Sequence, residues 1–138
     1  MEVRRTTRAD LDVIMGAPHL FDAPPDPDRT AEMLDDPRHH LFLALSMGDP
    51  VGFLSAVDYI HPDKPRAMWI NELGVLETAR RRSVATRLTA EASAHAQTIG
   101  CTEIWVLADP THEALGFYAS LSWAREGDHI AMFTKALT

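Results

Sequence analysis

The sequence predicts an α/β fold in which a mixed central sheet carries helices on both faces. The order of the expected elements is the first observation: one strand, two helices, three strands, and then a helix, a strand, a helix and a strand. The length is the second, because 138 residues, of which 46% are apolar, suit one soluble domain spanning residues 1–138. We find no internal repeat and no low-complexity tract.

The first part of the chain is expected to hold a short strand and two helices. Residues 2–6 form the strand, and a helix opens at residues 9–10, with Leu11, Ile14 and Met15 at helical spacing. Gly16 and Pro18 end this helix. After a loop rich in proline and aspartate at residues 22–28, Asp28 caps a second helix that runs to Leu34 and stops before Pro37.

Three strands are expected next. Residues 40–46 and 51–60 form a hairpin around a turn at residues 48–50, and a loop at 61–66 leads into a strand at 68–75.

The remaining elements alternate between helix and strand. An alanine-rich helix runs from Ser83 to about residue 98 and ends at Gly100, a candidate C-cap because glycine readily adopts the left-handed conformation. A strand at 102–108, a helix that starts at residues 109–111 and continues to Leu121, and a last strand at 129–135 complete the fold.

Charge and composition narrow the class of partner. The net charge of −7 argues against a nucleic-acid binder, which needs a basic face, and favours a cationic partner. Six carboxylates but only one cation, Arg29, lie between Asp22 and Asp36. This stretch is either a solvated acidic surface or one wall of a site for a polyamine-like substrate.

The same composition bears on location and on metals. No apolar run reaches the roughly 20 residues that span a bilayer, and residues 1–5 do not begin an apolar signal segment, so we expect a cytoplasmic protein without membrane contact. The single cysteine, Cys101, permits no internal disulfide. No histidine has metal-ligand spacing, so no metal is expected; His61 and His112 stay open as substrate contacts.

The most informative stretch is a strand that feeds a helix N-terminus. Residues 69–75 read as the strand, and Arg80, Arg81 and Arg82 stand where the next helix begins. The free N–H groups and the dipole of a helix N-terminus attract an anion. Glu72 lies in the otherwise apolar strand, where a carboxylate needs a partner such as Arg66 or Arg80, or has a catalytic task. A phosphate site beside a carboxylate suggests a nucleotide-containing cofactor next to a base.

These residues also carry a family resemblance. The run Arg80-x-x-Ser83-x-Ala85 resembles the Arg/Gln-x-x-Gly-x-Gly/Ala loop that binds the acyl-CoA pyrophosphate in the GCN5-related N-acetyltransferase superfamily. Within that superfamily, the segments at 20–22, 61–65, 70–75 and 105–107 resemble the type I aminoglycoside 3-N-acetyltransferases. The resemblance covers most of the chain. It implies a sheet splayed between its fourth and fifth strands, acetyl-CoA as co-substrate, and a homodimer.

The resemblance also implies roles for individual residues. Glu72 is the expected base and Tyr118 the acid that protonates the departing thiolate, while N–H groups of Gly74 and Val75 polarise the thioester if a bulge interrupts the strand at Gly74. Three carboxylates are expected to hold the substrate amine: Asp22, which the resemblance places near the acceptor site, Glu72, and Asp109, which ends a strand at the carboxyl edge of the sheet. The residues expected to bind the cofactor are Leu73, Gly74, Val75, Arg80, Arg81, Arg82, Ser83, Val84, Ala85 and Thr86.

Two positions depart from the family pattern. Ser83 stands where the family prefers glycine, which puts the cofactor affinity in doubt. Ser122-Trp123 replaces the Gly-Phe that commonly follows the family's tyrosine, which weakens the turn signal after Tyr118.

The sequence therefore predicts an acetyl-CoA-dependent N-acetyltransferase that acts on an aminoglycoside, at its 3-amino group, by direct attack of the amine. Cys101 lies away from the motif and does not favour a covalent acyl-enzyme. Two alternatives stay open: the acceptor is a polyamine, an amino acid or a protein N-terminus, or the chain is a non-catalytic acyl-CoA-binding module.

Overall fold

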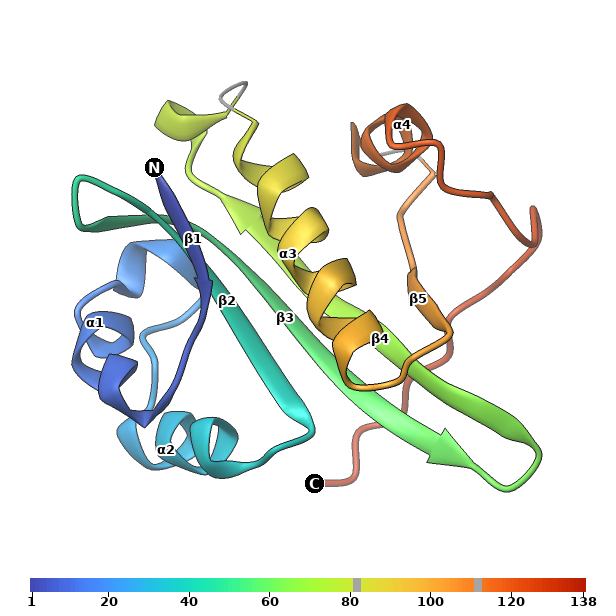
Figure 1. Ribbon diagram of the computed structural model, residues 1–138, viewed down its shortest axis with the longest axis horizontal. Coiled ribbons are helices and arrows are strands. Elements are labelled where there is room, and N and C mark those ends of the chain that lie inside the picture. The colour runs from blue at the N-terminus through green and yellow to red at the C-terminus, as the bar shows by residue number, and fades with distance from the viewer. Residues whose placement is uncertain (81–82, 111–112) are drawn as a thin grey trace. The chain divides into compact units, whose positions relative to one another are not determined.

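A five-stranded sheet, in the order β1-β2-β3-β4-β5, forms the frame of the protein (Figure 1). The computed structural model describes residues 1–80, 83–110 and 113–138, which fold as two compact units, 1–107 and 108–138. The sheet belongs to the first unit. Its first four strands pair antiparallel and β5 runs parallel to β4. The strands are β1 (Glu2–Arg5), β2 (His39–Ser46), β3 (Asp49–His61), β4 (Lys64–Val75) and β5 (Glu103–Val106).

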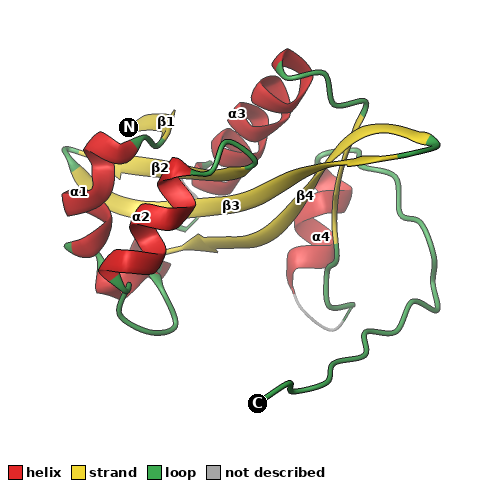
Figure 2. Ribbon diagram, turned by 90° about the horizontal axis from the view of Figure 1, so that it is seen from below, coloured by secondary structure: helices red, strands yellow, loops and turns green. Residues whose placement is uncertain are grey.

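Helices cover both faces of this sheet, as the sequence predicts. α1 (Leu11–Met15) and α2 (Pro27–Asp35) lie on one face and α3 (Val84–Thr98) lies on the other (Figures 1 and 2). Successive residues of β2 divide between the two faces, as the pleat requires. Leu41, Leu43 and Leu45 pack with Ile14 of α1, whereas the rings of His40 and Phe42 contact His95 of α3.

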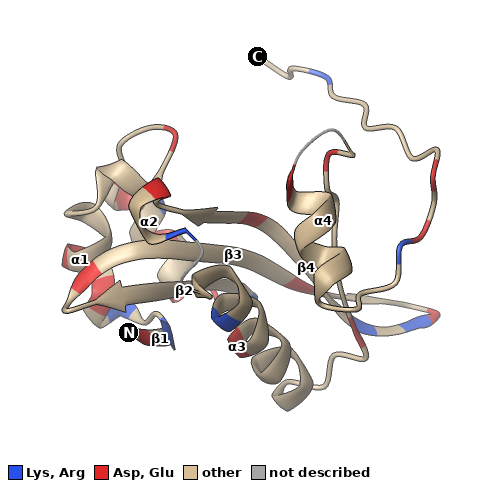
Figure 3. Cartoon of the chain, turned by 90° about the horizontal axis from the view of Figure 1, so that it is seen from above, with Lys and Arg blue, Asp and Glu red and all other residues tan. Residues whose placement is uncertain are grey.

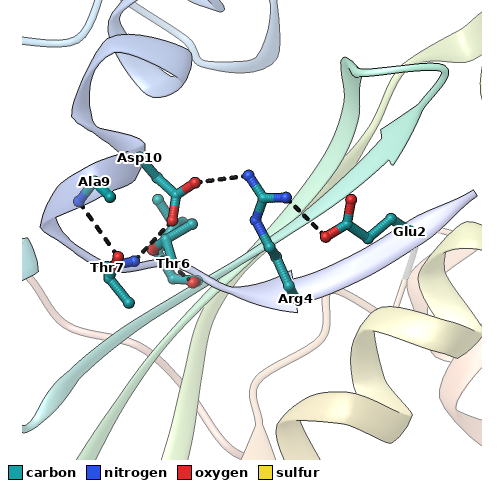
Figure 4. A network of polar contacts seen from close by, with 7 residues as sticks. Glu2, Arg4, Thr6, Thr7, Ala9 and Asp10 are labelled. Atoms are coloured by element: carbon teal, nitrogen blue, oxygen red, sulfur yellow. Dashed lines mark hydrogen bonds and ion pairs between the residues drawn. The ribbon is translucent and has the colours of Figure 1, made fainter.

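A capping box starts the first helical segment (Figure 4). The Thr7 hydroxyl accepts from the N–H of Ala9, and Asp10 accepts from the N–H of Thr7 at 2.9 Å. Arg4 donates to both Glu2 and Asp10, which ties β1 to this turn. The expected helix start at residues 9–10 is therefore a 3-10 turn, Arg8–Asp10, that leads into α1.

The second helix begins earlier than its sequence suggests. Asp26, not Asp28, is the N-cap: its carboxylate accepts from the N–H of Arg29 at 2.8 Å, and Pro27 occupies the first turn, where a missing N–H costs nothing. Asp35 pairs with Arg8, and Asp36 pairs with His39 at 3.1 Å. Much of the acidic stretch between residues 22 and 36 (red in Figure 3) thus serves caps and ion pairs.

The hairpin strands are longer, and their turns shorter, than predicted. Met47 and Gly48 both have positive φ, 52° and 86°, which is the geometry of a tight two-residue turn, so β3 begins at Asp49. The predicted loop at 61–66 is wrong: β3 extends to His61 and β4 starts at Lys64. Pro62 lies in the turn and Pro65 lies within β4, so neither proline prevents the pairing from reaching His61 and Lys64.

The parallel pairing of β4 with β5 is short. It joins Ala67–Ile70 to Glu103–Val106, although β4 continues to Val75. The two strands are therefore unpaired after Ile70, which agrees with the splay between the fourth and fifth strands that the family resemblance implies. A bulge lies at the same place: Ser55 pairs with Glu72 and Ala56 with Ile70, so Asn71 is the extra residue of β4.

The second unit contains α4 (Glu113–Ser120) and an extended tail. The predicted strand at 129–135 is wrong, because the residues described after Ser120 form no strand. A β-strand needs a partner strand, and the described residues of this unit include no strand with which residues 129–135 could pair. None of the described helices is long and apolar enough to cross a membrane.

A buried polar network joins four strands on the α3 face. His40 Nε2 lies 2.6 Å from Asp58 Oδ1, Arg66 donates to Asp58 Oδ2, and Arg5 Nε donates to His40 Nδ1 at 3.0 Å. Because Nδ1 accepts, Nε2 carries the proton of a neutral ring. Burial lowers the pKa of His40 and of its neighbour His95. Burial opposes ionisation of Asp58, but hydrogen bonds from His40 and Arg66 outweigh it and lower its pKa.

Acid is therefore expected to destabilise the fold between pH 7 and pH 5. The lowered pKa values of both histidines mean that the unfolded chain, with a histidine pKa of about 6.5, binds more protons in this range. The free energy of unfolding should fall by up to about 1.4 kcal/mol per pH unit for each histidine. Urea unfolding at a series of pH values measures this slope. His95→Gln should make it shallower, and a free energy that stays constant from pH 7 to pH 5 would contradict the account.

Candidate functional site

The open edge of β4 is the first component of the site. Leu76 N–H donates to Val51 O at 2.9 Å. In an antiparallel ladder the direction alternates, so Gly74 N–H also points at β3, while Leu73 and Val75 direct their N–H groups to the opposite edge. β5 does not pair with β4 along this stretch. Two backbone donors and their carbonyls thus line an edge where an amide-containing ligand can pair as a strand does.

Glu72 lies one residue before this edge begins. It is exposed and stands opposite Ser55, on the face of the sheet that carries Phe53 and α1. It forms no hydrogen bond or ion pair with the residues that the structure describes. The arginines considered as partners act elsewhere: Arg66 binds Asp58, and Arg80 Nε donates to Val75 O at 3.4 Å. The bulge at Asn71 turns this carboxylate to solvent, so the apolar surroundings expected from its neighbours in sequence are absent at this position.

Gly74 has a packing role and is not the bulge. It stands in regular register opposite Phe53, and a Cβ at this position would lie 2.6 Å from Phe53 Cε1. The bulge expected at Gly74 is therefore wrong, and in the register of β3 the Gly74 N–H faces β3 rather than the open edge. The extra residue that reorients the strand is Asn71, three positions earlier.

The first turn of α3 is the second component. A Cβ on Gly52 would lie 2.9 Å from Val84 Cγ1, so a glycine in β3 lets this turn approach the sheet closely. Val84 is buried, and the N–H groups of Ala85 and Thr86, which have no partner within the helix, lie at the positive end of this 15-residue helix. This arrangement suits a phosphate group.

Ser83 takes the left-handed conformation immediately before α3, with φ 61° and ψ 20°, and its side chain makes no cap hydrogen bond. This backbone explains why a glycine is typical at the position: an L-residue is strained there. Arg80 is exposed and flanks the turn. The predicted pyrophosphate ligands Arg81 and Arg82, and also His112, lie outside the described residues.

Asp22 lies over the same face of the sheet as Glu72. The ring of Phe21 packs against Phe53, with centroids 4.8 Å apart, and Phe53 stands opposite Gly74. The exposed Asp22 follows directly, so its loop is anchored above β3 and β4. The structure thus brings two of the three predicted substrate carboxylates to one face.

The other predicted polar residues belong to the second unit, which is described by itself. Asp109 is exposed and follows the end of β5 by three residues. Tyr118 is buried on α4 between the rings of Phe117 and Trp123, at 5.0 and 5.2 Å, and burial raises its pKa to about 12. Ser122 has a φ of 62°, so its backbone is left-handed at the position where the family commonly has glycine.

Two further residues considered from the sequence are Cys101 and His61. Cys101 is buried at the end of the α3–β5 connection, and burial raises the pKa of its thiol, which disfavours a nucleophilic thiolate. His61 pairs with Asp63 at the tip of the β3–β4 hairpin, away from the open edge. The described residues contain no group of three or more His, Cys, Asp or Glu that could hold a metal ion.

The chain resembles known proteins both in sequence and in fold. The sequence model of the Acetyltransferase (GNAT) family matches residues 9–123. Among solved structures, an aminoglycoside acetyltransferase from an uncultured soil metagenomic sample, in complex with sisomicin, has a TM-score of 0.87 at 18% identity, covering 99% of this chain and 96% of that chain. No curated protein matches this chain in sequence.

Two further structures show the same architecture. AAC(6')-Iy in complex with the bisubstrate analogue CoA-S-monomethyl-acetylneamine has a TM-score of 0.80 at 23% identity, covering 98% of this chain and 97% of that chain. A ribosomal-protein-alanine N-acetyltransferase from Brucella melitensis biovar Abortus 2308 has a TM-score of 0.75 at 17% identity, covering 99% and 100%. At these identities the likeness establishes a shared fold.

Ser83→Gly is expected to stabilise the protein. Glycine removes the left-handed strain of about 1–2 kcal/mol and loses part of this gain to the greater freedom of the unfolded chain, for a net gain of about 0.5–1 kcal/mol. Thermal and urea unfolding measure it. Ser93→Gly in the middle of α3 is the control and should destabilise by about 0.5 kcal/mol, the difference in helix propensity between the two residues. If both substitutions destabilise alike, the left-handed geometry at Ser83 is wrong.

Proposed function

The chain belongs to the acetyltransferase (GNAT) family, and from this premise we propose that it transfers the acetyl group of acetyl-CoA to an amino group of an aminoglycoside antibiotic. One observation carries the proposal: an exposed carboxylate, Glu72, an open strand edge and a helix N-terminus occur together in one compact unit. The family match runs from residue 9 to residue 123, so it covers most of the first compact unit and residues 108–123 of the second, which supports a single domain.

Two parts of the site fit acetyl-CoA. The first-turn N–H groups of Val84, Ala85 and Thr86, with the exposed Arg80 and the sequence neighbours Arg81 and Arg82, suit its pyrophosphate. The edge of β4 at Leu73 and Val75 suits the two amides of its pantetheine arm, because backbone donors and acceptors there have no strand partner in β5. The thioester would then lie near Ile70, where the strands separate, and beside Glu72.

The chemistry assigned to this arrangement is direct transfer. Glu72 accepts a proton from the substrate ammonium, directly or through water, and the free amine attacks the thioester carbonyl. The N–H of Leu73, the edge donor nearer to Ile70, donates to the developing oxyanion, which leaves the Val75 N–H and the edge carbonyls for the pantetheine amides. The tetrahedral intermediate loses a proton from its nitrogen to solvent and collapses, the C–S bond breaks, and coenzyme A leaves as the thiol once a proton reaches its sulfur.

Tyr118 is proposed as the donor to that sulfur. Its pKa of about 12 keeps the phenol protonated at neutral pH, so a hydroxyl hydrogen is always available. The thiol of coenzyme A has an ordinary pKa of about 8.5, so complete transfer from the phenol is uphill. Its role is therefore to donate a hydrogen bond that stabilises the thiolate until solvent supplies the proton.

The acceptor is assigned from charge and resemblance. A net charge of −7 and the exposed carboxylates Asp22 and Glu72 on one face suit a small polycation. The sequence resemblance favours the 3-amino group, whereas AAC(6')-Iy carries a 6' designation in its name, so product analysis has to fix the position.

Acetylation removes a cation from the drug, and we therefore propose that the enzyme confers antibiotic resistance. We further propose a cytoplasmic homodimer, which sedimentation and cell fractionation test.

Glu72→Gln is expected to lower kcat/KM for the aminoglycoside by about 10²–10⁴, the range for loss of a general base, without changing the affinity for coenzyme A. Thiol release from acetyl-CoA measures turnover with gentamicin, kanamycin, spermidine and an alanine-terminated peptide offered separately. Calorimetry measures coenzyme A binding.

Cys101→Ala and Tyr118→Phe are the companion variants. The first should leave turnover intact and the second should lower kcat, since direct transfer needs the phenol and not the thiol. Turnover with spermidine or the peptide alone would assign another acceptor. Binding of coenzyme A with no turnover of any amine would make the chain a non-catalytic acyl-CoA-binding module.

A further inference from the structure

Three aromatic side chains form a cluster on the sheet that none of the roles above uses. Tyr59 comes from β3, Trp69 from β4 and Trp105 from β5. The indole rings of Trp69 and Trp105 lie 6.0 Å apart at an interplanar angle of 30°, and Trp105 Nε1 donates to Tyr59 Oη at 2.6 Å. We call these three residues the aromatic platform.

The platform lies beside the proposed base. Val57, Trp69 and Trp105 stand in one cross-strand row, and the next row on the same face contains Ser55 and Glu72, because the bulge absorbs Asn71. Rows on one face are separated by two residues of rise, about 7 Å. A ligand whose amine reaches the Glu72 carboxylate therefore places its adjoining carbon skeleton over Trp69 and Trp105.

Sheet register and hydrogen bonding hold the platform in place. Trp69 and Trp105 are the last pair but one before β4 and β5 separate after Ile70. The bond to Tyr59 fixes the plane of the Trp105 indole across two strands. Rigid aromatic rings lose little conformational freedom when a ligand stacks on them, so an ordered cluster of this kind is suited to binding.

The platform also remains accessible. α1 packs over the β2 and β3 side of this face, where Leu41, Leu43 and Leu45 surround Ile14. Tyr59 is 37% exposed, and both indoles are half-buried rather than enclosed. Carboxylates lie on both sides along the strands: Glu72 follows Trp69, and Glu103 precedes Trp105 on the same face, both exposed.

This combination selects a chemical class of ligand. Aromatic faces bind the C–H side of a saturated ring and attract an ammonium group, while flanking carboxylates pair with cations. A linear polyamine satisfies the carboxylates but gives the indoles little surface. A six-membered ring with amino substituents, such as an amino sugar, satisfies both.

We propose that the aromatic platform is the stacking site for the ring of the acceptor that is acetylated, and so determines the preference for cyclic over linear amines. The proposal rests on the proposed acetyltransferase function and adds the residues that select its substrate. Tyr59, Trp69 and Trp105 act as binding residues, and Tyr59 positions Trp105.

Trp105→Leu tests this with the full-length protein. We expect the KM for gentamicin to rise about tenfold or more, while the KM for acetyl-CoA stays within twofold and the KM for spermidine is unchanged. Trp105→Phe keeps an aromatic face but also loses the hydrogen bond to Tyr59, so it should raise the KM for gentamicin by less than Trp105→Leu does. Tyr59→Phe, which removes only the hydrogen bond to the indole, should have an intermediate effect. Far-ultraviolet circular dichroism and the urea midpoint establish that each variant is folded.

A direct binding measurement accompanies the kinetics. Titration of the wild-type protein with gentamicin, without acetyl-CoA, should change the tryptophan fluorescence, and Trp105→Leu should lose most of this change. Equal losses of affinity for gentamicin and spermidine, or a gentamicin KM that Trp105→Leu leaves within twofold, would overturn the stacking site although Glu72-dependent acetylation persists. If no amine is acetylated, the proposed function fails instead, and the fluorescence titration still decides whether the platform binds an amino sugar.

Discussion

Backbone hydrogen bonding along β4 is the constraint on which the rest of the structure depends. Buried N–H and C=O groups need partners, and β4 has them on both edges only as far as Ile70. Beyond that residue β3 still pairs with one edge, while β5 has left the other. The bulge at Asn71 falls at this transition and turns Glu72 to the exposed side. One departure from regular pairing thus creates both a binding edge and an accessible carboxylate.

Close packing then brings the anion site to that edge. Glycines occur where elements approach most closely: Gly52 admits Val84 of α3, and Gly74 admits the ring of Phe53. The first contact presses the helix N-terminus onto the strands, and the second anchors the loop of Asp22 through Phe21. The buried network around Asp58 holds the opposite end of the same strands together, at a cost in acid stability.

Much of this could be predicted from sequence, and the failures have physical reasons. The apolar pattern and the turn residues predicted every strand of the first unit, because both can be read from a few neighbouring residues. Sequence placed the bulge of β4 at Gly74, the more obvious candidate, because only the register of β3 shows that Asn71 is the extra residue. It placed the cap of α2 at Asp28, since two aspartates flank Pro27 and only hydrogen bonding distinguishes them. It also predicted a strand at 129–135, where apolar residues suggest burial but no described partner strand exists.

Amide hydrogen exchange of β4, with and without acetyl-CoA, tests the central claim most directly. Gly74 N–H points at β3 and should already exchange slowly in the free protein, whereas Leu73 and Val75 N–H should exchange quickly. Saturating acetyl-CoA should slow exchange at Leu73 and Val75 and leave Gly74 nearly unchanged. Exchange at Leu73 and Val75 that is slow without ligand, or that saturating acetyl-CoA leaves fast, would contradict the open edge as the binding site.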